Sequence, residues 1–183
     1  MKQLNLFQEN IKYIHGGTKT IGHRKEKRPL STKHAIHLVL KSKKAFGDRS
    51  FLRHRKAIGG ILATYAEKYG VAIKDSVNMG NHIHLKIKIA ERKAFANFLR
   101  TVTALIARLV TAATKAHRFG RFWDGIPFTR ILKTSFEEFG LRGYFAANRV
   151  ERRHGYEQRE MYLDQFNEWI YKLRRRKKRE TLC

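Results

Sequence analysis

The chain has 183 residues, which suits one domain with appendages and is short for two full domains. Its 40 Lys and Arg against 15 Asp and Glu give a formal charge of +25, which favours a polyanionic partner. Nucleic acid is the leading candidate for that partner. The single cysteine, Cys183, excludes an intramolecular disulfide and a cysteine metal cluster.

The same features predict a cytoplasmic location, with association with the nucleoid when DNA is bound. The best candidate for a membrane span, residues 95–116, is interrupted by Arg100, Arg108 and Lys115. The first ten residues, MKQLNLFQEN, lack the apolar core of a signal peptide. A role at a membrane surface could use the same basicity but would explain none of the motifs below.

The first half of the chain predicts two secondary structure elements after an irregular start. Residues 1–33 are polar and basic without a sustained period, and we expect a basic N-terminal arm. Apolar side chains alternate from residue 35 to 41, which is typical of a strand. Residues from about 49 to 69 have apolar positions near helical spacing, and Gly70 would end that helix.

A β-hairpin follows. Residues 71–77 predict a second strand, and residues 78–81, Asn-Met-Gly-Asn, are typical of a turn. In the third strand, residues 82–89, isoleucines and a leucine point to one face while two histidines and two lysines point to the other. One face is therefore core, and the other is available for chemistry or solvent.

Residues 95–110 carry an i, i+3, i+4, i+7 apolar stripe and predict a long second helix over the apolar sheet face. Residues 127–132 are a candidate fourth strand. Alternating strands and helices in this order predict an α+β ferredoxin-like sandwich, an antiparallel sheet with two helices on one face.

A further helix should begin after Thr134, because Glu137 stands at the spacing of a capping box. This helix carries Tyr144. Gly140 and Gly143 each weaken a helix by roughly 0.5–1 kcal/mol relative to Ala, so a break or mobile joint before Tyr144 is expected.

The last segment, from about 158 to 179, predicts a basic C-terminal helix, in which seven of the eight residues 172–179 are Lys or Arg. The chain thus divides into an arm (1–33), a domain that carries the motifs (34–150) and a basic helical extension (151–183).

His82 and His84 flank one residue in a strand, so both imidazoles project from one face about 6.6 Å apart. They can bind one ion, although two ligands do not complete a site. Two ordinary exposed histidines would give the same pattern. His34 and His37 have no partner at ligand spacing, and we interpret both as structural.

Tyr144 and Asn148 are four residues apart, so a helix would place them on one face, one turn apart. Alone, Tyr144 could equally be a half-buried packing residue. Phe122 and Trp123 could stack an unpaired base or fill the core beside the glycine turn.

An ordered set of motifs resembles the single-tyrosine HUH transposases of insertion sequences (the IS200-like type), particularly the REP-associated tyrosine transposases. From about residue 28 to 150 the set comprises NHIHLKIKI, the FLR of the next helix, GRFWDGIPFTRIL and YFAANRV. The sequence departs from close relatives at Phe145 and Arg149, where these often have Ile and Pro. This departure concerns the subfamily and the end of the helix more than the chemistry.

The resemblance implies that His82, His84 and Asn148 bind a divalent metal, Mg²⁺ or Mn²⁺, and that Tyr144 is the nucleophile. Such proteins bind folded or hairpin single-stranded DNA, form a 5′-phosphotyrosine link and leave a free 3′-hydroxyl. A phenol of pKa about 10 is only ~0.1% ionised at neutral pH, so it needs an electrophilic phosphate, which a metal can supply. No nucleotide cofactor is needed, because the covalent link conserves the phosphodiester energy.

Several basic residues are candidates for phosphate contacts, although each could also be a solvated surface residue. They are Lys86, Lys88, Arg130, Arg149, Arg174, Arg175 and Arg176.

In related proteins the tyrosine helix serves its own chain or a partner, so a homodimer is compatible with the sequence. The alternative function is a non-catalytic single-stranded DNA- or RNA-binding protein derived from such a transposase. A two-histidine RNA phosphoesterase would need a second His-x-Ser/Thr motif, which the sequence lacks.

Overall fold

The computed structural model describes residues 13–17 and 27–180, with side chains up to residue 172. The described residues form two units: the sheet unit, within residues 9–134, and the helical unit, within residues 135–183. The described elements, in chain order, are β1 (Ile14–His15), β2 (Ala35–Lys41), η3 (Gly47–Arg49), α1 (Arg55–Lys68), β3 (Val71–Asn78), β4 (His82–Ile89), α2 (Arg92–Thr111), β5 (Phe128–Leu132), α3 (Ser135–His154) and α4 (Tyr156–Glu180).

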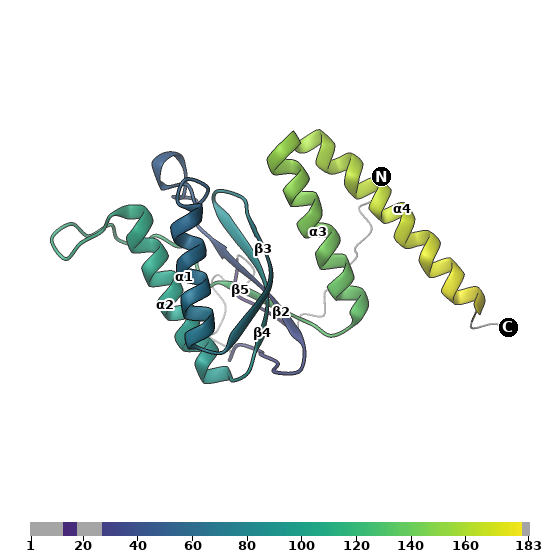
Figure 1. Cartoon of the computed structure of the whole chain (residues 1–183), viewed down its shortest axis with the longest axis horizontal. Coiled ribbons are helices and arrows are strands. Elements are labelled where there is room, and N and C mark those ends of the chain that lie inside the picture. Colours follow the sequence, from purple (N-terminus) through teal and green to yellow (C-terminus); the bar gives the residue numbers. More distant parts are fainter. Residues whose placement is uncertain (1–12, 18–26, 181–183) are drawn as a thin grey trace. The chain divides into compact units, whose positions relative to one another are not determined.

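The sheet unit contains one five-stranded sheet in the order β1-β5-β2-β4-β3, with every pairing antiparallel (Figure 1). The four strands that were predicted are present, and the predicted ferredoxin-like α+β architecture is confirmed. β1 lies within the segment expected to be an irregular arm. It pairs with β5, so Ile14 lies opposite Arg130.

Helices α1 and α2 cover one face of the sheet and form its core (Figure 1). Alternate residues of the strands and one stripe of each helix are buried there: Ile36, Leu38, Leu40, Ile83, Leu85, Ile87, Ile89, Ile58, Leu62, Ala66, Phe95, Phe98, Val102, Ile106 and Val110. The period of two in the strands and of 3.6 in the helices therefore predicted the buried face correctly. By length and hydropathy α2 could also cross a membrane, but its apolar stripe lies in this core.

Helix α1 begins at Arg55, not near residue 49 as predicted. The preceding segment is tied to the β3–β4 turn instead. The Phe51 N–H donates to the carbonyl oxygen of Gly80 at 2.7 Å, and the Asn78 side-chain amide donates to the carbonyl oxygen of Phe51 at 2.9 Å. These two bonds occupy the backbone groups that a helix would use, and they seat the fully buried Phe51 ring in the core.

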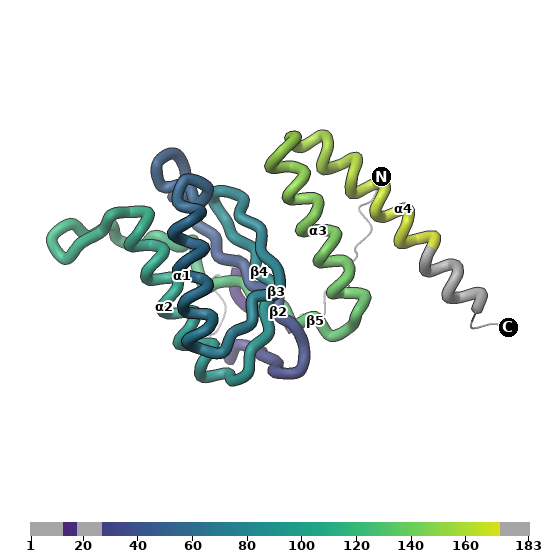
Figure 2. The backbone as a smooth tube through the Cα atoms, viewed as in Figure 1, coloured from purple at the N-terminus to yellow at the C-terminus, as the bar shows by residue number. Residues whose placement is uncertain are grey.

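The helical unit is an antiparallel pair of helices, and the break predicted before Tyr144 is wrong. α3 runs without interruption from Ser135 to His154 (Figure 2). A Cβ at Gly143 would lie 2.1 Å from Cζ of Phe166 on α4, so this glycine permits close approach of the two helices. Tertiary packing outweighs its low helix propensity.

Aromatic side chains fill the space between α3 and α4. The Phe139 ring lies 5.4 Å from that of Phe166 and 5.2 Å from that of Trp169. Leu163 and Ile170 on α4 are buried. The helix itself confirms the prediction for residues 158–179.

Candidate active site

The sheet face opposite α1 and α2 carries the predicted histidines, and we call it the histidine face. Antiparallel register places two rows of side chains across it. The first row is Arg130, His37, Lys86 and Asp75, and the second is Phe128, Val39, His84 and Val77. His82 lies opposite Lys41 at the edge of the second row.

A β-bulge in β3 shapes the outer edge of this face. The register shifts between Ile73 and Asp75, so Ile73 pairs with Ile87 on the core side while Asp75 pairs with Lys86 on the histidine face. The bulge thereby places a carboxylate opposite one of the predicted phosphate-binding lysines.

His82 is half-buried, and its ring orientation is fixed by the residue before it. Its Nδ1 lies 2.5 Å from Oδ1 of Asn81. An amide oxygen can only accept, so neutral His82 carries its proton on Nδ1 and exposes the lone pair of Nε2. Burial, and then the charge of Lys41, lowers the pKa of His82, which favours this neutral form.

His84 is 5% exposed, and its ring centroid lies 4.8 Å from that of His82. Burial lowers the pKa of His84 to about 2, with smaller contributions from His37 and His82. Two neutral imidazoles from one strand therefore lie side by side. Neutral imidazole nitrogens are what a divalent cation needs as ligands.

His37 is a member of this cluster, so the prediction that it has no partner is wrong. Its Nε2 lies 3.0 Å from Nδ1 of His84, and the two rings stack with centroids 5.3 Å apart. Burial, followed by the charge of Arg130, lowers the pKa of His37 to about 3. The partner lies on the neighbouring strand, and the available signal was that His37 and His84 both point away from the core in strands that pair.

The basic residues predicted to contact phosphates differ in accessibility. Lys88 is exposed and Lys86 is half-buried, whereas Arg130 is only 8% exposed and lies opposite His37. Arg149 on α3 is half-buried. The side chains of Arg174, Arg175 and Arg176 lie outside the described residues.

Phe122 belongs to the core and the half-buried Trp123 packs against it, which favours the core interpretation of that segment. Phe122 is 5% exposed and meets the ring of Phe51 edge-on at 6.0 Å. The Trp123 indole N–H donates to the carbonyl oxygen of Thr103 at 3.1 Å. The Phe122 ring is therefore not available as a free stacking platform.

In the helical unit, Tyr144 and Asn148 lie one turn apart on α3, as predicted from their spacing. Tyr144 is half-buried and Asn148 is 2% exposed. Among the described residues, the buried Nδ2 of Asn148 has no hydrogen-bond partner. A buried N–H donor without such a partner is costly, and it suits an acceptor such as a phosphate oxygen, whereas a cation would bind Oδ1.

The donor set is compatible with a divalent metal. His82 and His84 place two imidazole rings side by side on β4 of the sheet unit, and Asn148 lies on α3 of the helical unit. In the described part of the chain, no three side chains drawn from His, Cys, Asp and Glu are grouped to hold a metal. Two imidazole nitrogens leave positions open for further ligands such as phosphate oxygens and water.

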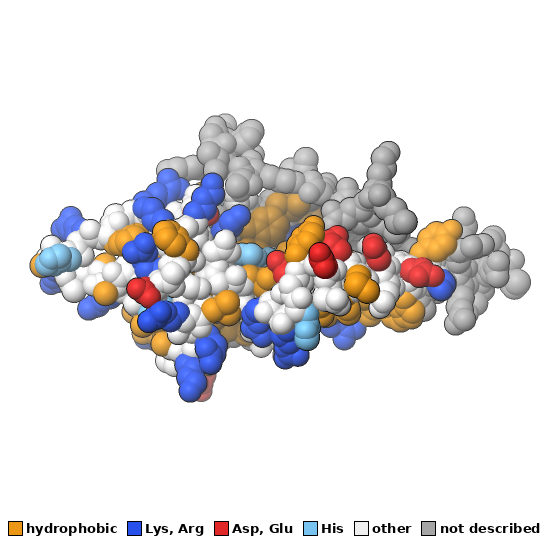
Figure 3. Space-filling view, turned by 90° about the horizontal axis from the view of Figure 1, so that it is seen from above, with side chains coloured by type: hydrophobic (Ala, Val, Ile, Leu, Met, Phe, Trp, Pro, Cys, Tyr) orange, Lys and Arg blue, Asp and Glu red, His pale blue; other side chains and the backbone are white. Residues whose placement is uncertain are grey.

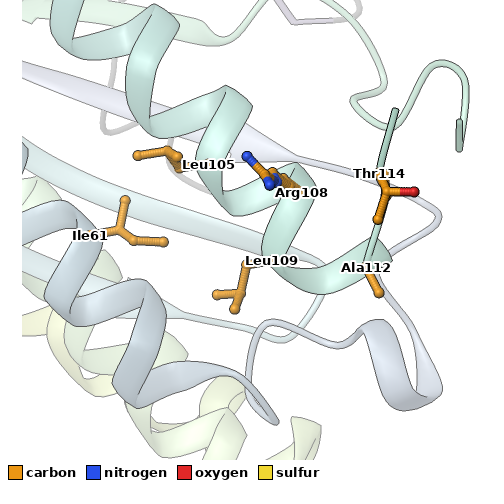
Figure 4. A pocket seen from close by; sticks show the side chains of 7 residues that line it. Ile61, Leu105, Arg108, Leu109, Ala112 and Thr114 are labelled. Carbon is orange, nitrogen blue, oxygen red and sulfur yellow. The ribbon is translucent and has the colours of Figure 1, made fainter. Parts of the chain in front are cut away.

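A shallow pocket of about 420 Å³ lies elsewhere, between α1 and α2. In Figure 4, Ile61 of α1 faces Leu105 and Leu109 of α2 across it, and Arg108 is its one charged residue. None of the predicted site residues line it.

Charge is divided unevenly between the two units. Residues 9–134 contain 27 Lys and Arg against 7 Asp and Glu, whereas residues 135–171 contain 5 against 7. On the face shown in Figure 3, Lys and Arg side chains spread over the sheet unit, while Asp and Glu gather along the helices of the helical unit. The strong positive field therefore comes from the sheet unit and the basic run after Tyr171.

Comparison with known proteins identifies a matching family and similar solved structures. The family model "Transposase IS200 like" matches residues 31–132. No curated protein sequence matches the chain. A solved structure of a REP-associated tyrosine transposase bound to a REP hairpin has a TM-score of 0.57 at 9% identity, covering 73% of this chain and 76% of that one. A proposed transposase from Deinococcus radiodurans has a TM-score of 0.43 at 16% identity, covering 68% and 98%.

Proposed function

This chain belongs to the IS200-like transposase family, and on that premise we propose that it cuts and rejoins single-stranded DNA with Tyr144 as the nucleophile. His82, His84 and Asn148 would hold Mg²⁺ or Mn²⁺. The observation that carries the proposal is the pair of neutral imidazoles on β4, each engaged through Nδ1, inside the segment that the family model matches. The REP hairpin bound by the structural relative supports hairpin DNA as the substrate class.

The proposed reaction exchanges one phosphodiester for another. The Tyr144 hydroxyl oxygen attacks the scissile phosphorus and the bond to the 3′ oxygen breaks. The phenolic proton is released, the leaving 3′ oxygen is protonated, and the 5′ phosphate stays on the tyrosine. A bound divalent cation would polarise that phosphate as a Lewis acid. Attack by a 3′-hydroxyl reverses the step and rejoins the strand, so no nucleotide cofactor is consumed.

Other residues of the chain would bind and orient the strand. Lys88 is exposed on the histidine face, and Lys86 lies beside it. Their positive charges, with the excess charge of the sheet unit, would attract the DNA backbone without reading its sequence.

The decisive experiment is Tyr144→Phe. The full-length protein is incubated with Mn²⁺ and an end-labelled pool of hairpin DNAs, and denaturant-resistant adducts are mapped by mass spectrometry. We expect the wild type to form an adduct on Tyr144, and the variant to form none and lose cleavage at least 10³-fold, because only the nucleophilic oxygen is removed. Tyr162→Phe, a half-buried tyrosine of the same unit, is the matched control and should behave as wild type.

An adduct on another tyrosine, or undiminished cleavage by Tyr144→Phe, would contradict the mechanism. Binding of hairpins without an adduct across the pool would favour the alternative, a non-catalytic binding protein.

The metal role is tested separately by His82→Ala. Loss of one of two imidazole ligands should abolish cleavage while most DNA affinity is retained, since phosphate contacts depend on the basic surface. Cleavage that survives both this substitution and EDTA would contradict the metal site.

A further inference from the structure

His37 occupies a defined place on the histidine face that no part of the proposed reaction uses. It projects from β2, the strand that pairs with β4. Its ring stacks on that of His84 at an interplanar angle of 25° and meets the edge of Phe128 at 5.8 Å. Neighbours on two strands therefore fix the ring, and its Nε2 is held 3.0 Å from Nδ1 of His84.

The neighbouring ligand provides an internal comparison. His82 is bonded through the same nitrogen, Nδ1, to an oxygen of Asn81 that can only accept. That hydrogen bond selects the tautomer with the proton on Nδ1 and leaves Nε2 as the nitrogen that can bind a cation. A metal-binding histidine normally donates its other ring N–H to such an acceptor, which sets the ring orientation.

We propose that His37 is a positioning residue for His84: its Nε2 accepts the hydrogen bond from Nδ1–H of His84, so that His84 presents Nε2 to the divalent ion. The inference rests on the proposed metal site for its functional meaning. Neutral His37 then carries its own proton on Nδ1. In the opposite arrangement His37 donates, the proton of His84 sits on Nε2, and that nitrogen cannot bind a metal.

The proposal assigns equivalent tasks to two different residue types. Asn81 fixes one ligand from the adjacent position in the chain, and His37 fixes the other from the neighbouring strand. Loss of such a hydrogen-bond partner typically lowers metal affinity 10- to 100-fold.

The first test concerns the protein without metal. Long-range ¹H–¹⁵N spectra of the imidazole nitrogens of the full-length chain report which nitrogen of His84 bears the proton. We expect the Nδ1–H form in the wild type and in His37→Gln, whose side-chain oxygen can replace Nε2 as acceptor. We expect a mixture of tautomers in His37→Leu. A wild-type His84 with its proton on Nε2 overturns the proposal without any variant having to fold.

The second test is Mn²⁺ binding by calorimetry with the same proteins. His37→Leu should bind Mn²⁺ 10- to 100-fold more weakly, and His37→Gln should recover most of the affinity, which a purely structural role would not predict. His34→Leu, at the bend before β2, is the control and should match the wild type. Equal affinity in the Leu variant and the wild type overturns the proposal.

Failure of the proposed function is recognised separately. If the wild type binds no Mn²⁺, the metal site itself is wrong, and the tautomer data alone decide whether His37 orients His84. An unchanged His84 tautomer in His37→Leu would then refute the positioning role.

Discussion

The two units of this protein differ in charge, in architecture and in whether the family model matches them. The sheet unit is strongly basic and includes the whole segment matched by the family model, with both imidazole ligands of the proposed site. The helical unit is slightly acidic up to Tyr171, lies beyond the matched segment and carries Tyr144. In the proposed mechanism, therefore, the attraction of DNA and the two imidazole ligands belong to one unit, and the nucleophile belongs to the other.

Each unit contains one of the two tryptophans, so the comparison can be tested by fluorescence. Trp123 lies in the sheet unit and Trp169 in the helical unit. With Trp169→Phe the remaining tryptophan reports the sheet unit, and with Trp123→Phe it reports the helical unit.

The largest effect is expected from Phe98→Ala in the core of the sheet unit. Phe98 is fully buried, and its truncation should lower the free energy of unfolding by about 3–5 kcal/mol. Urea unfolding monitored by Trp123 should show this loss, while Trp169 should report little change. Phe46→Ala, at a ring that is 62% exposed, is the control and should stay within about 0.5 kcal/mol of wild type. An equal shift of both probes would mean that the two units unfold as one.

The converse perturbation is Gly143→Ala in the helical unit. The new Cβ would meet the ring of Phe166, and overpacking of this kind costs about 1–3 kcal/mol. Unfolding followed by Trp169 should register the loss. In a Phe166→Ala background the clash disappears, and the same substitution should stabilise the helix by up to about 1 kcal/mol. Destabilisation of equal size in both backgrounds would show that Phe166 is not the reason for the glycine.

The same contrast explains how far the sequence could be interpreted. In the sheet unit, alternation placed the strands and the buried face correctly, because one side of each strand faces a core made by the same segments. Local spacing could not show that Phe51 forms hydrogen bonds with the β3–β4 turn, since these bonds join residues far apart in sequence. Because of them, α1 begins only at Arg55.

The candidate site shows the same limit. His82 and His84 were recognisable because their spacing lies within one strand, and Tyr144 and Asn148 because theirs lies within one helix. His37 was missed because its pairing with His84 depends on the register between β2 and β4. Gly143 was misinterpreted because helix propensity carries no information about Phe166.

A third prediction concerns pH and again separates the units. The pKa values of His37 and His84 in the fold lie far below the ordinary value of 6.5, so below that pH the unfolded chain binds more protons than the folded one. Stability of the sheet unit should therefore be complete above about pH 6.5 and fall as the pH drops toward 3. Each such group contributes at most about 2 kcal/mol of loss at pH 5.

This prediction is checked by urea unfolding of metal-free Trp169→Phe at pH 7.5 and 5.0. His37→Gln should reduce the difference, because one buried imidazole is removed. A sheet unit equally stable at both pH values would show that these histidines become protonated in the fold without cost.

The smallest effect is expected from truncation after Tyr171, which removes the seven basic residues between 172 and 179. Neither tryptophan should report a change in stability larger than about 0.5 kcal/mol, because exposed ion pairs such as that of Lys172 with Glu168 stabilise little. DNA binding should weaken about tenfold at low salt. The slope of log K against log salt should decrease by about 0.7 for each phosphate of a single strand that the shortened chain no longer neutralises.

Fluorescence anisotropy with two hairpins of different sequence, at several salt concentrations, measures both quantities, and truncation after Glu180 is the control. Since binding to phosphates carries no base code, the ratio of the two affinities should stay constant. A truncated protein that keeps its affinity but changes its preferred hairpin would show that this segment reads sequence, and that the sheet unit is not the sole source of DNA recognition.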